Sequence, residues 1–334
     1  MSEQSRIESK GRVQVSVVTP AYCEEKNLPI LYERLKAVFD GLDVTWSWLV
    51  VDDHSSDRSY QVMDEISRQD PRVTSLRLAR NSGSHVALAC GLHHADGDCT
   101  IAIAADLEDP PETIPRLIEE WRNGTQIVWA ARGERKGVGR GSIMASRTFF
   151  WILRKVAKLE DIPPTGADFF LLDSRVVQAF KRFDERNVSL LALITWMGFR
   201  QSTIFYDKDA RVYGQSNWTL LRKIRLTVDS VVAFSHLPVR IMSLFGLAVG
   251  LLGFAFAAVI IVDAILGNPP QGWASTMVVI LVLSGVQMMM LGMLGEYLWR
   301  TLDESRSRPL YVIESRSDDK PIENQSESDI EAAQ

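Results

Sequence analysis

The chain has few cysteines, and no pattern joins them. Its 334 residues include three, Cys23, Cys90 and Cys99. Their spacing matches neither a metal-binding motif nor a disulfide framework. We therefore expect reduced thiols, as is usual in a cytoplasmic setting.

Two further features are missing from the sequence. It has no basic stripe and a formal net charge of −5, which argues against nucleic acid as a partner. Residues 1–12 are polar and charged without an apolar run, so we expect a flexible N-terminus and not a secretory signal. The chain is longer than one typical domain and can bury a full core.

Long uncharged runs occur in the C-terminal third, from Ile241 to Val262 and from Trp273 to Gly295. Each exceeds the roughly 20 residues that a helix needs to cross a bilayer. The loop between them has no Lys or Arg, whereas basic residues flank the pair: Arg222, Lys223, Arg225, Arg240, Arg300, Arg306 and Arg308. The length of the runs predicts two transmembrane helices within residues 237–300, and the positive-inside rule places both termini in the cytoplasm. The alternative is a pair of buried core helices.

The segments around these runs carry weaker signals. Residues 218–236 alternate basic and apolar side chains at helical spacing, which predicts a helix at the membrane surface. Gly246 and Gly250 form a G-x-x-x-G pattern that favours close helix packing, either within the hairpin or in a homo-oligomer. Residues 301–334 form a cytoplasmic tail that is polar and acidic from about residue 315, where we expect disorder.

In the N-terminal two thirds, short apolar runs alternate with helical patterns of about 10 to 15 residues, which predicts βαβ units and a mostly parallel sheet. We expect strands at residues 15–20, 46–51, 73–78, 101–105, 126–131, 169–172 and 201–206. Polar side chains follow four of these strands: Tyr22 and Glu24, Asp52 and Asp53, Arg80, and Asp106. Ligands of open α/β sheets bind at the carboxyl ends of strands, so the sequence predicts a site at this edge.

The most informative stretch runs from Thr100 to Glu112. Its apolar run ends in three carboxylates, Asp106, Glu108 and Asp109, just before two prolines. Crowded carboxylates repel one another unless a cation or a proton joins them. We therefore hypothesise a hard divalent ion, Mg²⁺ or Mn²⁺, whose shell substrate phosphates complete. The alternative is a solvated turn whose acids favour the N-terminus of the next helix.

Taken together, these motifs resemble those of a known family. Val17-Val-Thr-Pro-Ala-Tyr-Cys-Glu-Glu-Lys-Asn-Leu28 resembles the opening of family 2 glycosyltransferases with the GT-A fold, and Val51-Asp-Asp-His-Ser-Ser-Asp57 resembles their V-D-D-G-S-x-D turn. Segments 80–92, 105–112 and 211–218 are similar to motifs of polyprenyl-phosphate sugar transferases, such as dolichyl-phosphate mannose synthases and bactoprenol glucosyltransferases. Gly295-Glu-Tyr-Leu-Trp-Arg300 resembles the ending of the two-span bacterial members. The resemblance covers residues 13–313.

The resemblance implies an α/β chain: a GT-A (Rossmann-like), mostly parallel sheet domain at residues 13–217, followed by a two-helix transmembrane hairpin. It implies inverting transfer of a single sugar from a nucleotide sugar, UDP-glucose-like or GDP-mannose-like, to a polyprenyl (undecaprenyl) phosphate for cell-envelope glycan modification. One alternative is a processive polysaccharide synthase, although the chain has no Gln-x-x-Arg-Trp sequence and two spans make a poor polymer channel. The other is a nucleotide-binding membrane scaffold whose catalytic site has decayed.

Carried over by position, the resemblance also implies roles for individual residues. Those implied for the nucleotide sugar are Pro20, Tyr22, Glu24, Asp52, Asp53, Arg80 and Asp106. Those implied for the divalent ion are Asp106 and Glu108, and those for phosphates or the acceptor are Arg132, Arg135, Arg211 and Ser216. The implied catalytic residues are Asp168, Asp106 and Arg211, and Asp168 matches the acid proposed as a base near the acceptor.

The chain departs from the family pattern at several of these motifs. Ala104 stands where the family usually has the first Asp of Asp-x-Asp, and Glu108 stands where it usually has Gln. We hypothesise that Glu108 replaces the missing negative charge, so that metal binding survives with altered ligands. Ser84 and Asn217 replace lysines, which weakens phosphate binding, and His54 replaces a turn glycine.

Overall fold

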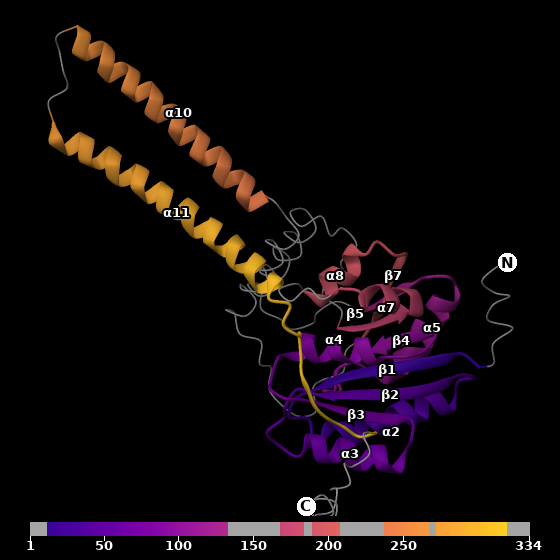
Figure 1. Cartoon of the computed structure of the whole chain (residues 1–334). Helices are drawn as coiled ribbons and strands as arrows, with labels where there is room; N and C mark the ends of the chain where they lie inside the picture. The colour runs from indigo at the N-terminus through magenta and orange to yellow at the C-terminus, as the bar shows by residue number, and fades with distance from the viewer. Residues whose placement is uncertain (1–11, 133–167, 184–188, 208–236, 267–271, 319–334) are drawn as a thin grey trace, which may run out of the picture.

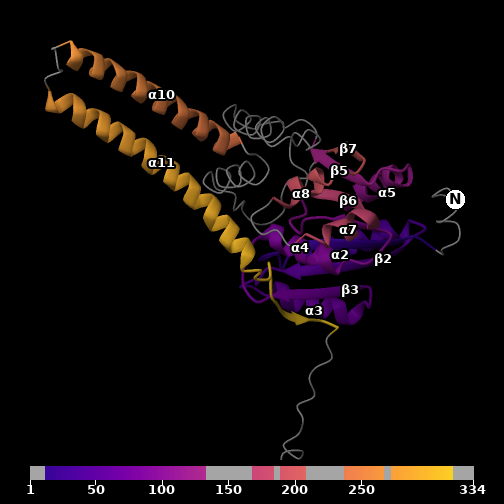
Figure 2. The ribbon, with the colours of Figure 1, turned by 45° about the horizontal axis from the view of Figure 1, so that its top comes forward.

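The computed structural model describes residues 12–132, 168–183, 189–207, 237–266 and 272–318. These residues form an eight-stranded mixed sheet with helices on both faces, from which a pair of long helices projects (Figures 1 and 2). This confirms the expected α/β class. The predicted N-terminal segment up to residue 11, the surface helix at 218–236 and the tail beyond 318 lie outside the described residues.

The sheet has the strand order β7-β5-β6-β4-β1-β2-β3-β8. The strands are β1 (Gln14–Ala21), β2 (Thr45–Asp52), β3 (Val73–Leu78), β4 (Cys99–Ala102), β5 (Ile127–Arg132), β6 (Phe169–Asp173), β7 (Gln201–Tyr206) and β8 (Ile313–Arg316). Neighbours from β4 through β1 and β2 to β3 are parallel, as are β5 and β7, whereas β6 and β8 run antiparallel to theirs. The sheet is therefore mostly parallel, as predicted.

Both faces of the sheet are covered by helices. One face carries α2 (Asn27–Asp40), α3 (Ser59–Gln69), the short helix η1 (Pro111–Thr113) and α5 (Ile114–Arg122); the other carries α4 (Ser84–His94), α7 (Ser174–Phe180) and α8 (Leu190–Trp196). Successive strand residues alternate between the two cores, so that Val17 packs into the first and Val18 into the second. Burial on both faces explains why these strands appear in the sequence as continuous apolar runs.

Helix α4 approaches the sheet closely through Gly91. A Cβ at this position would lie 2.2 Å from Val18 Cγ1 and 3.4 Å from Val51 Cγ2, so Gly91→Ala must push α4 away from β1. Overpacking of this kind costs about 1–3 kcal/mol, which exceeds the roughly 1 kcal/mol that alanine contributes to helix propensity. We expect a lower unfolding midpoint for Gly91→Ala in thermal unfolding of the full chain in detergent.

Gly41→Ala is the matched control, because its Cβ would meet only Val38 O at 3.5 Å. If the two variants unfolded at the same temperature, the close approach of α4 to β1 would be wrong.

The structure differs from the predicted elements in several places. Strand β4 ends at Ala102, although the amide of Ile103 still donates to Val18 O at 3.0 Å. Helix α7 was not predicted; it starts where the Asp173 carboxylate accepts a hydrogen bond from the Arg175 amide. Ser315 and Arg316, in the tail that we expected to be disordered, belong to strand β8.

Two long helices, α10 (Leu237–Ile265) and α11 (Trp273–Ser305), lie side by side and extend away from the sheet (Figures 1 and 2). The segment Met242–Ile260 of α10 is the one described stretch that is both long and apolar enough to cross a membrane. Apolar side chains on both helices are exposed, among them Phe254 at 80% and Met288 at 67%. In the structure they are therefore not core helices.

Candidate active site

The carboxyl ends of β1, β2, β3 and β4 meet at one edge of the sheet because these strands are parallel. The predicted site residues that end or follow them are Pro20, Tyr22, Glu24, Asp52, Asp53, Arg80 and Asp106. Strand β6 runs in the opposite direction, so its first residue meets the same edge. Its register with β4 pairs Ala102, the last residue of β4, with Phe170, and Asp168 directly precedes the first residue of β6. The structure thus brings Asp168 to the edge that carries Asp106.

The turns after β1 and β2 are bound to each other. The amide of Cys23 donates to Ser55 Oγ at 2.9 Å, and the amide of Glu24 donates to Ser59 Oγ at 2.8 Å. Tyr22, beside this junction, is 41% exposed, so its ring is accessible at the edge. The two turns form one unit on which a ligand can rest.

Asp53 fixes the loop between β3 and α4. Its Oδ1 accepts a hydrogen bond from the Ser82 amide and its Oδ2 accepts one from the Gly83 amide, both at 2.7 Å. Burial raises the pKa of this carboxyl, and the two amide bonds oppose that shift. Asp53 therefore shapes the loop that also carries Arg80.

Asp52 lies fully buried beneath the same turn. The Ser55 amide donates to its Oδ1 at 3.1 Å, and Arg77 Nη1 lies 3.3 Å from its Oδ2. Burial raises the pKa of Asp52, while the Ser55 bonds and the positive charge of Arg77 lower it. Our sequence analysis missed Arg77, although a charged residue between two leucines of a buried strand was a signal.

Left-handed backbone is concentrated at this edge. Four described non-glycine residues have positive φ, and three of them lie in the turns after β1, β2 and β4: Cys23 at 58°, His54 at 59° and Leu107 at 60°. His54 thus occupies the conformation for which glycine is suited, and its Nδ1 lies 3.0 Å from Leu78 O. Such strain persists where the surrounding structure imposes it, and it is typical of functional sites.

The three carboxylates after β4 do not all face the edge. Asp109 is buried and accepts a hydrogen bond from the hydroxyl of Tyr206, the last residue of β7. Asp106 and Glu108 are half-buried, and the Glu108 amide donates to Asp106 Oδ1 at 3.2 Å. Asp109 therefore anchors the turn to β7, and the cation hypothesis concerns Asp106 and Glu108.

The donor set of this turn suits a hard cation. Magnesium and manganese prefer oxygen ligands, and magnesium in particular is usually held by one or two carboxylates together with substrate phosphates. Among the described residues, no group of three or more His, Cys, Asp or Glu side chains converges. Asp106 and Glu108 therefore fit an ion that binds together with a diphosphate.

The remaining predicted residues divide into two groups. Arg132 ends β5, and its backbone pairs with Tyr206 of β7, so it reaches the same edge of the sheet. Arg135, Arg211 and Ser216 lie outside the described residues, and their contacts with phosphates or the acceptor stay predictions.

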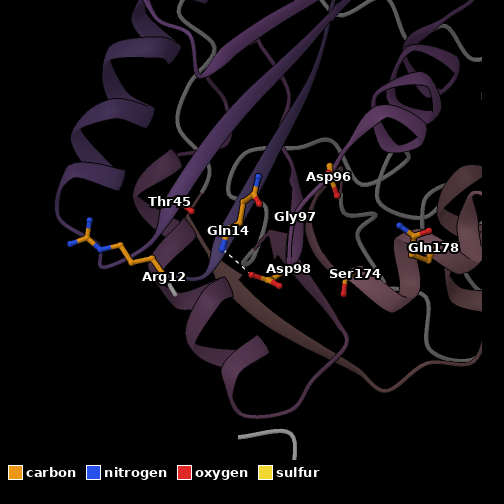
Figure 3. Close-up of a pocket in the computed structure, with 8 residues that line it drawn as sticks. All are labelled: Arg12, Gln14, Thr45, Asp96, Gly97, Asp98, Ser174 and Gln178. Atoms are coloured by element: carbon orange, nitrogen blue, oxygen red, sulfur yellow. Dashed lines mark hydrogen bonds between the residues drawn. The ribbon is translucent and has the colours of Figure 1, made fainter. Parts of the chain in front are cut away.

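A hollow at the other end of the strands lies away from this edge (Figure 3). It is lined by Arg12, Gln14, Thr45, Asp96, Gly97, Asp98, Ser174 and Gln178. Gln14 and Thr45 are the first residues of β1 and β2, which places the hollow at the amino ends of these strands. None of the predicted site residues lines it.

Comparison with known proteins gives a consistent set of similarities. Residues 16–180 match the family model described as glycosyl transferase family 2. An uncharacterised glycosyltransferase of Synechocystis sp. is 36% identical, over 90% of this chain and 95% of its own. The bactoprenol glucosyl transferase of Shigella phage SfX is 34% identical over 91% of this chain and 100% of its own. The undecaprenyl-phosphate 4-deoxy-4-formamido-L-arabinose transferase of Edwardsiella ictaluri is 32% identical, over 90% of this chain and 93% of its own.

Proposed function

The chain belongs to glycosyl transferase family 2, and from this premise we propose that it transfers a single sugar from a nucleotide sugar to a polyprenyl phosphate. Its sheet domain is the GT-A α/β fold. Relatives named for bactoprenol and for undecaprenyl phosphate support the acceptor class. The single observation that carries the proposal is the parallel arrangement of β1, β2 and β4, which puts the turns that carry Tyr22, Asp53 and Asp106 at the same end of the sheet.

The proposed reaction is one displacement with inversion at the anomeric carbon. An oxygen of the acceptor phosphate forms a bond to C1 of the sugar, and the bond from C1 to the diphosphate breaks, so that a nucleoside diphosphate leaves. Negative charge develops on the leaving diphosphate, and its neutralisation is normally the largest catalytic contribution. A divalent ion held by Asp106 and Glu108 would supply positive charge there. Arg132 and Arg211 are proposed to contact the phosphates.

The acceptor places the reaction at a membrane. We propose that α10 and α11 both span the inner membrane, with the catalytic domain and both termini in the cytoplasm. The exposed apolar side chains of the two helices and the basic residues that flank them in the sequence support this topology. The product would be a lipid-linked monophosphate sugar for cell-envelope glycans.

Asp168 is proposed to orient the acceptor and not to act as an obligate base. A phosphate monoester has a second pKa of about 6, so at pH 8 the acceptor is already a dianionic nucleophile. We expect Asp168→Asn to retain measurable turnover at pH 8, in an assay with saturating nucleotide sugar. Complete loss of transfer with unchanged binding of the lipid would instead make Asp168 the base.

The function is tested by the products of the full chain in lipid nanodiscs that contain undecaprenyl phosphate. Radiolabelled UDP-glucose and GDP-mannose are supplied in turn with Mn²⁺, and labelled lipid is separated by chromatography. One sugar per lipid phosphate supports the proposal. A polymer would identify a processive synthase, and nucleotide binding without transfer from either donor would identify a scaffold.

A further inference from the structure

The chain returns from the helix pair to the sheet and becomes part of it. Strand β8 starts at Ile313, eight positions after α11 ends at Ser305. It pairs antiparallel with β3 and is the outermost strand on that side of the sheet. The Ala79 amide donates to Val312 O at 2.9 Å. Ser75 and Ser317 exchange two hydrogen bonds, both at 3.0 Å. The C-terminal strand is therefore attached to β3 from Ser75 to its end at Leu78.

The register of β8 directs Glu314 towards the candidate active site. Arg77 pairs with Ser315 and Leu78 pairs with Ile313, so Glu314 is the extra residue of a β-bulge. Bulges commonly redirect a side chain beside a functional site. Glu314 Oε2 lies 2.9 Å from Arg77 Nε and 3.5 Å from His54 Nδ1.

Arg77 joins this tail residue to the buried wall of the site. Besides Glu314, its guanidinium contacts Asp52 Oδ2 at 3.3 Å and the backbone oxygen of Ser55 at 3.4 Å. It also lies over the ring of Tyr60 at 5.2 Å, and the Tyr60 hydroxyl accepts a hydrogen bond from Ser315 Oγ at 2.8 Å. A planar guanidinium held by several acceptors has a fixed orientation.

Glu314 contacts Arg77, and Arg77 contacts Asp52, so the surroundings of Asp52 depend on the C-terminal strand. Asp52 is fully buried, so a nearby positive charge matters more to it than to a solvated carboxylate. Glu314, the other carboxylate on Arg77, is about half exposed and holds the guanidinium from the solvent side. Without Glu314, Arg77 can turn away and leave the Asp52–Ser55 turn without its cation.

We propose that Arg77 and Glu314 are positioning residues for the donor site. The strand that returns from α11 holds Arg77 against Asp52 and thereby keeps the turn after β2 in the shape that receives the nucleoside part of the donor. This inference rests on the proposed function, because it takes that turn to be a donor site. It also makes β8 a part of the catalytic unit.

Titration calorimetry on the full chain in detergent, with UDP or GDP and Mn²⁺, tests the proposal. We expect Glu314→Gln to raise the dissociation constant about fivefold and Arg77→Gln about thirtyfold, because the second change leaves a buried carboxylate without its cation. Arg77→Lys should recover part of the loss, since it restores the charge without the planar fork. In turnover assays KM for the donor should rise while kcat stays within about twofold.

Arg72→Gln is the matched control. Arg72 pairs with Asp70 just before β3, at the end of the strand away from the site, with Nη2 2.6 Å from Asp70 Oδ2. It should lower stability without changing nucleotide affinity. If Arg72→Gln weakened binding as much as Arg77→Gln, the effect would be general destabilisation and the proposal would be overturned.

Two further outcomes separate this inference from the proposed function. If the unmodified chain binds neither UDP nor GDP, the proposed function is wrong. If it binds one of them and Glu314→Gln and Arg77→Gln bind it equally well, the function stands and the positioning role is wrong. The double variant should bind no more weakly than Arg77→Gln, since Glu314 acts through Arg77; additive losses would contradict this order of contacts.

Discussion

Replacing Asp106 with asparagine is expected to lower kcat about 1,000-fold. The substitution keeps the size of the side chain, but it removes one of the two carboxylates proposed to hold the cation, Asp106 and Glu108. The diphosphate must then leave without a cation to neutralise its negative charge. The measurement is single-sugar transfer to undecaprenyl phosphate at saturating donor.

Asp96→Asn controls for loss of an acidic side chain as such. Asp96 is exposed at the hollow by the amino ends of β1 and β2 (Figure 3), so its replacement should leave turnover within about twofold of the unmodified chain. Both variants should unfold near the same temperature. If the turnover of Asp106→Asn stayed within tenfold of the unmodified chain, Asp106 would not be a catalytic residue.

Glu108→Gln tests whether Glu108 compensates for Ala104. We expect the Mn²⁺ concentration for half-maximal turnover to rise at least about tenfold, because a neutral amide is a weaker ligand than a carboxylate. Electron paramagnetic resonance of Mn²⁺ in the presence of UDP measures the affinity for Mn²⁺ without a turnover assay. An unchanged Mn²⁺ dependence in both measurements would contradict the compensation.

The edge of the sheet could be predicted from the sequence because its determinants are local. Strands buried on both faces appear as apolar runs, and β3 and β7 have the bounds that these runs predicted, 73–78 and 201–206. Once the strands are known to be parallel, their carboxyl ends must share an edge. The position of Asp168 followed instead from family resemblance, and the antiparallel register of β6 explains it.

Contacts between distant segments could not be predicted in this way. Glu314 and Arg77 are 237 positions apart, and no periodicity in the polar tail indicates that it pairs with β3. The inward orientation of Asp109 depends on Tyr206, 97 positions away, so the three acids look alike in the sequence. Helix α7 has seven residues, which is too short for a 3.6-residue period to stand out.

Asp53→Asn is expected to raise KM for the donor about 30- to 100-fold, which corresponds to roughly 2–3 kcal/mol. The carboxylate accepts hydrogen bonds from two amides of the β3–α4 loop, at Ser82 and Gly83. An asparagine side chain offers one oxygen to one amide, but it turns an NH₂ group towards the other. Two hydrogen-bond donors, the asparagine NH₂ and a loop amide, then face each other away from solvent. The loop that carries Arg80 must therefore move.

Asp70→Asn is the matched control for this change. Asp70 is also buried and also accepts a backbone amide bond, from Arg72 at 2.9 Å, but it lies between α3 and β3 at the amino end of the strand. Because Arg72 also holds its pKa near 2, the substitution should lower the unfolding midpoint and leave KM unchanged. If both variants lost stability and neither changed KM, Asp53 would be a structural residue of the loop, and donor binding would depend on other groups at this edge.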